Sequence, residues 1–510
     1  MNSVSLRYIL ILIIGAGMAL FVTLSLFSGE ANKIGGFFRY FAALGVLIAL
    51  VRPTAGILLL IVSSGYLDMV KRFTMLELTV SEIDIASVLV FAPLLVAGMT
   101  LNVVGGWLFG PKTENTKLEI KLFMVCVVWA ILSLIPVLSA SGLRAAGNAL
   151  NYCAYPFLLI QAPKLFSNPQ FVKKCIVTLI ITYIPVMGLA VYEGNYGYIG
   201  ITMDYLLSGL SGEVRQLADA RPGAMSTLSG PPPLSLMMSL IGVYLILPYT
   251  TTGKFSILRK GGFISGPLAI LFFLAAYYTF ARTGWAVGGI FIAIVMLLNM
   301  KKFFIYLGGI SAATALTILY LSAGYLVETD AMHAWEDEIR RNDISDSNVQ
   351  ATTLGTFNGR LASMHQVVSN PEMWTPFGFK IAGKSVSNLE HPVHEFVGNL
   401  LVRVGYVPSV IFAIGGFFVM RKVININDRL PRGEQTNQFR ILIALGLACW
   451  ATAIQHGQTM FTFPVNLLWA FAFAMANGIY IYMKRQQVIE TADEVEPVPM
   501  KMDQRYVATN

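Results

Sequence analysis

The sequence predicts an all-α integral membrane protein with about fourteen transmembrane helices and one large outer loop. Of the 510 residues, 55% are hydrophobic and only 13% are charged, and a water-soluble fold cannot bury that much apolar surface. The apolar residues form separate runs of about 15 to 25, a length that crosses a bilayer as a helix. Basic residues concentrate in alternate loops, as the positive-inside rule requires. The net charge of +8 therefore indicates membrane topology and not nucleic-acid binding.

The spans follow one another along most of the chain. Tyr8–Phe27 is too long for the apolar core of a signal peptide and precedes no clear cleavage site, so we expect it to remain as the first span. Arg52 and Pro53 interrupt the next apolar run, which therefore forms either two spans or a re-entrant hairpin. The predicted spans are Tyr8–Phe27, Phe37–Val51, Thr54–Leu67, Ile83–Phe109, Leu118–Ser139, Ala145–Ala162, Lys174–Tyr192, Pro231–Thr250, Phe263–Phe280, Trp285–Met300, Phe303–Tyr325, Val404–Met420, Ile441–Ile454 and Phe461–Met483.

The loops richer in basic residues are assigned to the inner side of the membrane, together with both termini. The chain then divides into a scaffold of spans (1–220), spans that carry outer arginine turns (221–325), a large outer loop (326–392), C-terminal spans (393–485) and a polar tail expected to be disordered (486–510). The loops expected to face outward are Asp68–Asp84, Glu193–Gly230, Ala281–Gly284, Glu328–His391 and His456–Phe461.

No cofactor and no metal site is expected. The sequence contains no HExxH, no Cys-x-x-Cys, no nucleotide-binding glycine loop and no G-x-S-x-G. Nothing therefore indicates metal-dependent hydrolysis, nucleotide coupling or α/β-hydrolase chemistry. The cysteines lie in or beside apolar segments without metal-ligand spacing and are expected to be packing residues: Cys126, Cys153, Cys175 and Cys449.

Arginines at the outer ends of spans are the first candidates for a binding site. Arg282 lies in a very short outer turn, where a charge is costly unless it is paired or meets an anion; the alternative is a side chain that extends to interfacial water. Arg221 precedes a Gly- and Pro-rich entrance to a span, which is either a structural loop or the lining of a cavity. Arg215 lies in the same outer loop. Arginine is the cation suited to bidentate phosphate contact, so these positions favour a phosphorylated ligand.

The large outer loop and its edge hold most of the histidines. His394 starts a half-polar helix that leads into a span, and a neighbouring carboxylate such as Glu395 can orient an imidazole that exchanges protons. His391 can play the same part, and a structural role at the interface is the alternative for both. Arg360 begins a segment with helical apolar spacing, which predicts a short amphipathic helix.

Together these features resemble the O-antigen polymerase and ligase superfamily of bacterial envelope enzymes over the segment Arg221–Gly478. The ligase signature has Asn, Ser or Gln where Glu395 stands, and Gly, Thr or Tyr where Pro408 stands. The motifs that carry the resemblance are the Arg-x-Gly stretch at Arg221, the turn Ala281-Arg282-Thr283-Gly284-Trp285, Arg360-Leu361 followed by Pro376-Phe377-Gly378-Phe379, and the spacing from His394-Glu395 to Gly405.

The resemblance implies a GT-C-like fold in the bacterial inner membrane, with the large loop in the periplasm and both termini in the cytoplasm. It implies a metal-independent, inverting transfer of glycan from an undecaprenyl-diphosphate-linked oligosaccharide to an acceptor hydroxyl. Expected partners are this donor, an acceptor glycan or lipid A core, the bilayer, and chain-length regulator or export proteins. The implied catalytic residues are Arg221, Arg282 and His394, and the implied substrate-binding residues are Arg360, Arg215, His391 and Glu395.

Three functions remain open. A polymerase joins one lipid-linked repeat to another, and the altered ligase signature favours this alternative. A ligase moves the finished glycan to lipid A core or to a protein, with the same donor and the same residues. A transporter of lipid-linked sugars performs no chemistry; transporters usually show inverted repeats and charges at the bilayer midplane, which this sequence lacks.

Overall fold

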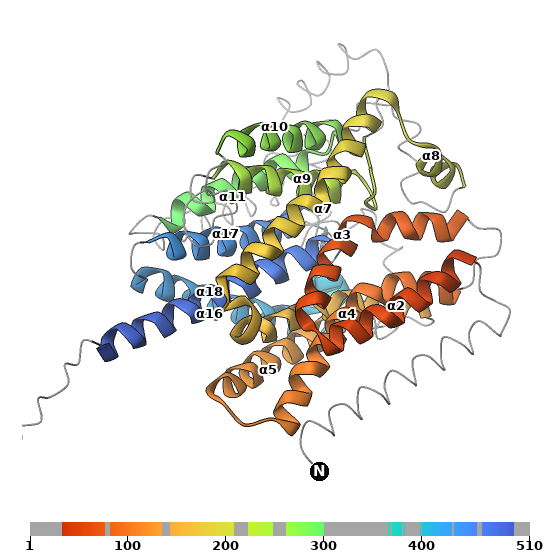
Figure 1. Ribbon diagram of the computed structural model, residues 1–510. Coiled ribbons are helices and arrows are strands. Elements are labelled where there is room, and N and C mark those ends of the chain that lie inside the picture. Colours follow the sequence, from red (N-terminus) through yellow and green to blue (C-terminus); the bar gives the residue numbers. More distant parts are fainter. Residues whose placement is uncertain are drawn as a thin grey trace, which may run out of the picture.

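A computed structural model describes residues 33–76, 82–134, 143–208, 223–247, 262–299, 366–367, 370–379, 382, 398, 400–430, 433–455 and 462–493 (Figure 1). The regular structure in this part of the chain is helical, without strands. Five of the described helices are long and apolar enough to cross a membrane, and four shorter ones are also apolar. The chain is therefore an α-helical membrane protein, as predicted. The predicted spans Tyr8–Phe27 and Phe303–Tyr325 lie outside the described residues.

The longer helices match most of the predicted spans in position. The elements are α2 (Lys33–Val51), α3 (Pro53–Leu76), α4 (Glu82–Phe109), α5 (Glu114–Leu134), α6 (Leu143–Cys153), the 3₁₀-helix η2 (Tyr155–Gln161), the π-helix η3 (Ala162–Phe166), α7 (Pro169–Tyr196), α8 (Gly200–Leu207), α9 (Pro231–Ile246), α10 (Gly262–Tyr278), α11 (Arg282–Leu298), the 3₁₀-helix η7 (Pro371–Met373), the π-helix η9 (Leu400–Val404), α16 (Tyr406–Arg429), α17 (Glu434–Gln455) and α18 (Val465–Asp493).

The interruption at Arg52 and Pro53 separates two helices and does not form a hairpin of two short pieces. Pro53 is the first residue of α3. Proline is common at this position because the first N–H group of a helix has no partner within the helix. The carbonyl oxygen of Ile48 accepts from the N–H of Arg52 at 2.7 Å. A Cβ atom added to Gly56 would lie 2.8 Å from the Cα atom of Ala49, so the two helices touch just beyond the corner.

Several predicted boundaries are wrong. The span predicted to end at Leu67 continues as α3 to Leu76, so the outer loop does not begin at Asp68. The predicted disordered tail is helical at its start, because α18 continues to Asp493. The predicted span Ala145–Ala162 is not one α-helix but α6 followed by η2 and η3. Two prolines inside η2 and η3 lack the backbone N–H that a continuous α-helix needs: Pro156 and Pro163.

The core forms between helices that are distant in sequence. Helix α9 is buried along nearly its whole length and packs against α10 and α11, while α17 packs along α18. Helix α7 crosses the molecule and contacts both α3 and α10, which joins the N-terminal helices to the α9–α11 group (Figure 1). All four cysteines are free and buried, as expected of packing residues.

Helix ends that were predicted on the same side of the membrane lie together. At one end, the Arg440 guanidinium donates to Asn427 Oδ1 at 2.7 Å and to Asn299 Oδ1 at 2.9 Å, which joins the start of α17 to the ends of α16 and α11. Near the N-terminal ends of two other helices, Arg39 of α2 pairs with Asp84 of α4 at 2.5 Å. The orientation of these ends relative to the cytoplasm stays a prediction.

Candidate functional site

Of the predicted site residues, the structure describes only one, Arg282. Arg282 is the first residue of α11, and its backbone is described. The other predicted site residues lie outside the described residues: Arg215, Arg221, Arg360, His391, His394 and Glu395. Of the amphipathic helix predicted after Arg360, only Gln366 and Val367 are described; both are helical, and Val367 is buried as its place on the apolar stripe predicts.

The chain just after Arg221 lies against the chain just before Arg282. The N–H of Ala224 donates to the carbonyl oxygen of Tyr278 at 2.9 Å. A Cβ atom added to Gly223 would lie 2.3 Å from the carbonyl oxygen of Thr279, so no other residue fits at this position without a shift of the backbone. Two segments separated by more than one predicted span therefore meet in direct backbone contact.

The turn that leads into Arg282 is anchored to the start of α9. Phe280 has a φ of 50°, a left-handed conformation that is unfavourable for a side chain with a Cβ atom. The Ser235 hydroxyl donates to the carbonyl oxygen of Ala281 at 2.8 Å. A Cβ atom added to Gly284 would lie 2.3 Å from the carbonyl oxygen of Ser235. The starts of α9 and α11 are thus in close contact, which fixes the position of the Arg282 backbone.

Two buried charged residues hold the segment Gly223–Gly230, which we call the entry loop. Arg72 of α3 donates from Nη1 to the carbonyl oxygen of Ser226 at 2.5 Å, and from Nη2 to the carbonyl oxygen of Leu228. Glu193 of α7 accepts with Oε2 from the N–H groups of Met225 at 3.0 Å and Ser226 at 2.6 Å. The exposed fractions of Arg72 and Glu193 are only 2% and 4%. We call these two residues the loop clamp.

Other contacts attach the entry loop to α3 and α7. The Thr227 hydroxyl donates to the carbonyl oxygen of Gly65 at 2.5 Å, and the Ser226 hydroxyl donates to that of Val186 at 2.7 Å. Because a buried backbone group without a partner costs free energy, these bonds stabilise an irregular segment inside an apolar bundle. Irregular backbone at membrane depth needs such cover from the protein.

The charges of the loop clamp are balanced by the protein itself. Arg72 interacts electrostatically with Asp68 and Glu193, and Asp68 also interacts with Lys71 and Ser229. Arg72 directs its hydrogen bonds to oxygens of the chain, including Thr202 Oγ1 at 3.0 Å. It is therefore not available to an anion that enters from outside, and its chemistry is that of a support for the loop.

Sequence reasoning did not identify the loop clamp. Arg72 and Glu193 were assigned to outer loops and not to helix ends buried in the protein. A signal was present, because both charges lie close after apolar helical runs, where an ionisable residue is costly unless it has a partner. The partners are backbone atoms more than a hundred residues away in one case, and no sequence pattern shows such a contact.

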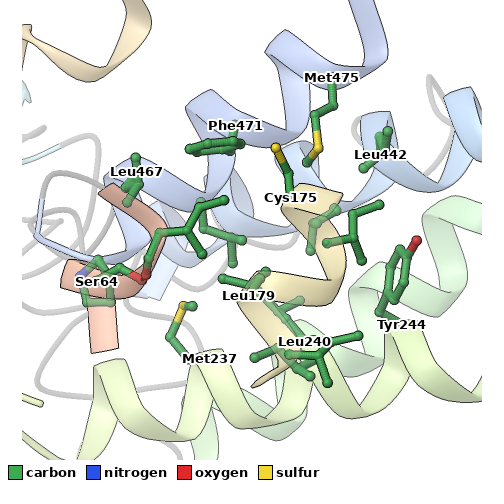
Figure 2. Close-up of a pocket in the computed structure, with 17 residues that line it drawn as sticks. Ser64, Cys175, Leu179, Met237, Leu240, Tyr244, Leu442, Leu467, Phe471 and Met475 are labelled. Carbon is green, nitrogen blue, oxygen red and sulfur yellow. The ribbon is translucent and has the colours of Figure 1, made fainter. Parts of the chain in front are cut away.

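Five helices line an apolar pocket of about 50 Å³ (Figure 2). It lies where α3, α7, α9, α17 and α18 meet, and nearly all its lining side chains are apolar, such as Leu240, Phe471 and Met475. The Tyr244 hydroxyl, which is buried, has no hydrogen-bond partner in the described structure. The apolar lining gives room for apolar groups.

No group of three or more His, Cys, Asp and Glu side chains in the described ranges is arranged to hold a metal ion. No protein-family model, curated protein or solved structure matches the chain.

Proposed function

We propose that this protein is a membrane glycosyltransferase that polymerises oligosaccharide repeats carried on undecaprenyl diphosphate. The observation that supports the proposal best is the backbone contact between the entry loop and the turn before α11. Arg221 precedes the entry loop by two positions in the sequence, and Arg282 follows the turn as the first residue of α11; sequence reasoning assigned both arginines to a diphosphate. We propose that this contact brings the two cations into one region of the protein.

Two arginines in one region suit the leaving group of this reaction. A lipid diphosphate gains negative charge as the bond from the anomeric carbon to its oxygen breaks, and guanidinium groups stabilise such a charge without a metal ion. Each arginine can bind phosphate oxygens through two parallel N–H groups. We assign this role to Arg221 and Arg282, with Arg360 and Arg215 as further contacts to the donor.

The acceptor supplies the nucleophile. Its hydroxyl oxygen attacks the anomeric carbon, its proton passes to His394, and the glycan leaves the diphosphate in the same step. Because a single displacement occurs with no protein nucleophile, the configuration at the anomeric carbon inverts. His391 and Glu395 are assigned to binding and orientation of the acceptor end.

The helical bundle supports a donor with a lipid tail. The long apolar helices place the protein in a bilayer. We propose that the polar head group of the donor binds beside the entry loop, which packs against α3 and α7. We propose the periplasmic face of the bacterial inner membrane as the location, with an acceptor glycan and chain-length regulator or export proteins as partners.

The test is a product analysis with purified protein and an undecaprenyl-diphosphate-linked oligosaccharide, with lipid A core present or absent. Longer lipid-linked glycans made without lipid A support the polymerase. Product that forms only after lipid A core is added replaces the polymerase with the ligase. No covalent product under either condition, together with movement of the lipid-linked sugar across vesicles, replaces both with a transporter.

A further inference from the structure

Ser226 in the entry loop has a backbone conformation that the surrounding residues must maintain. Its φ is 49°, in the left-handed region that residues with a Cβ atom rarely adopt. Three of its polar atoms have partners: its N–H donates to Glu193 at 2.6 Å, its carbonyl oxygen accepts from Arg72 at 2.5 Å, and its hydroxyl donates to Val186 at 2.7 Å. Such a conformation persists only where its surroundings over-determine it.

We infer that Glu193 and Arg72 are positioning residues for the transfer proposed above, on which this inference rests. They hold Ser226 in its left-handed conformation, and this fixes the course of the entry loop from Gly223 onward. Glu193 accepts with Oε2 from two N–H groups of the entry loop, and its carboxylate also interacts with Thr202 of α8. Neither residue touches the donor.

The geometry favours positioning over a general role in folding. Helices α3 and α7 are built from apolar residues that pack into the main core, whereas the loop clamp acts at their ends. The entry loop contains Gly223, whose contact with Thr279 leaves no room for a side chain. A small rotation of the entry loop therefore breaks its backbone contact with Tyr278 and Thr279. Misplacement of a catalytic group by about 1 Å can lower a rate roughly a hundredfold.

The first experiment measures donor kcat and KM per folded molecule for variants of Glu193. Glu193→Ala removes the acceptor for two N–H groups and is expected to lower kcat by roughly tenfold to a hundredfold, with a smaller change in KM. Glu193→Gln keeps an acceptor oxygen and is expected to stay close to wild type. Ser226→Gly in the Glu193→Ala background is expected to recover part of the loss, since glycine adopts positive φ without support.

A purely structural role predicts a different result. Glu193→Ala would then reduce the yield of folded protein but leave kcat per folded molecule unchanged, and Ser226→Gly would not restore it. Loss of activity in Glu193→Gln as large as in Glu193→Ala would also overturn the inference, because it would show that the charge and not the acceptor matters.

A second experiment tests the loop clamp without any enzymatic reaction. Ala224 is 1% exposed and the native cysteines are buried, so the thiol introduced by Ala224→Cys is expected to react slowly with a water-soluble maleimide. Adding Glu193→Ala is expected to accelerate the reaction. Tyr196→Cys is the control, because Tyr196 is 79% exposed and its replacement should react rapidly with or without Glu193.

The two experiments separate two kinds of failure. In one outcome, Glu193→Ala accelerates the labelling of Ala224→Cys, but the wild-type protein transfers no glycan. This outcome would refute the proposed function and would still support the loop clamp. In the other outcome, the wild-type protein transfers glycan, but Glu193→Ala changes neither the labelling rate of Ala224→Cys nor kcat. This outcome would refute the positioning role and would still support the proposed function.

Discussion

The buried pair of Arg39 and Asp84 gives a stability prediction whose magnitude follows from the geometry. Arg39 Nη2 and Asp84 Oδ1 are 2.5 Å apart, with side chains 3% and 0% exposed. At an effective dielectric constant of about 20, charges at this distance attract with roughly 7 kcal/mol. Burial costs several kcal/mol for each ion, so the intact pair is close to neutral. Removal of one partner deprives the other buried charge of this bond, which costs about 3–5 kcal/mol.

Arg39→Met and Asp84→Leu, made singly, are therefore each expected to lower the free energy of unfolding by about 3–5 kcal/mol. The double variant is expected to lie within about 1 kcal/mol of wild type, because apolar residues of similar volume replace such pairs well. The assay is unfolding in mixed detergent micelles, followed by circular dichroism. Arg52→Met is the control, since Arg52 is an exposed arginine at the α2–α3 corner. A double variant as unstable as the sum of the two single variants would refute the reasoning.

Three further results are expected. Gly478→Ala should lower the midpoint of thermal unfolding, because its Cβ atom would lie 2.3 Å from the backbone of Phe166, whereas Gly266→Ala, with open space around its Cβ position, should not. Phe471→Ala enlarges the apolar cavity and should cost about 3–5 kcal/mol in detergent unfolding; a loss below about 1 kcal/mol would contradict tight packing there. Arg282→Lys should abolish glycan transfer in the product assay, because lysine lacks the bidentate fork; full activity would reduce Arg282 to a point charge.

The length of apolar runs made most of the helices predictable. The span predicted as Ile83–Phe109 is α4, Glu82–Phe109, because twenty or more apolar residues have few alternatives in a bilayer. Prediction failed where tertiary contacts compensate a charge. Asp68 and Arg72 read as the start of a loop, but partners on α7 and the entry loop let α3 continue through them.

The sequence shows two of the segments that meet at the candidate site, but not the contacts that support them. The Gly- and Pro-rich approach to α9 and the short turn before α11 are visible in the sequence, and the structure shows them in contact through Ala224 and Tyr278. The loop clamp depends on side chains that reach backbone oxygens and N–H groups from distant helices. Arg72 and Ser226 are separated by 154 positions, and hydrophobic periodicity carries no information on such a pairing.

The central claim is that Arg282 serves glycan transfer from a lipid diphosphate, and one measurement tests it most directly. Purified wild type, Arg282→Ala and Arg421→Ala are compared for transfer from an undecaprenyl-diphosphate-linked oligosaccharide, after each is shown to elute as a folded species. Arg421 is an exposed arginine on α16 and is predicted to lie on the inner side of the membrane. Its replacement therefore controls for the loss of a positive charge. We expect transfer by wild type and Arg421→Ala, and none by Arg282→Ala. Wild-type transfer by Arg282→Ala would contradict the claim.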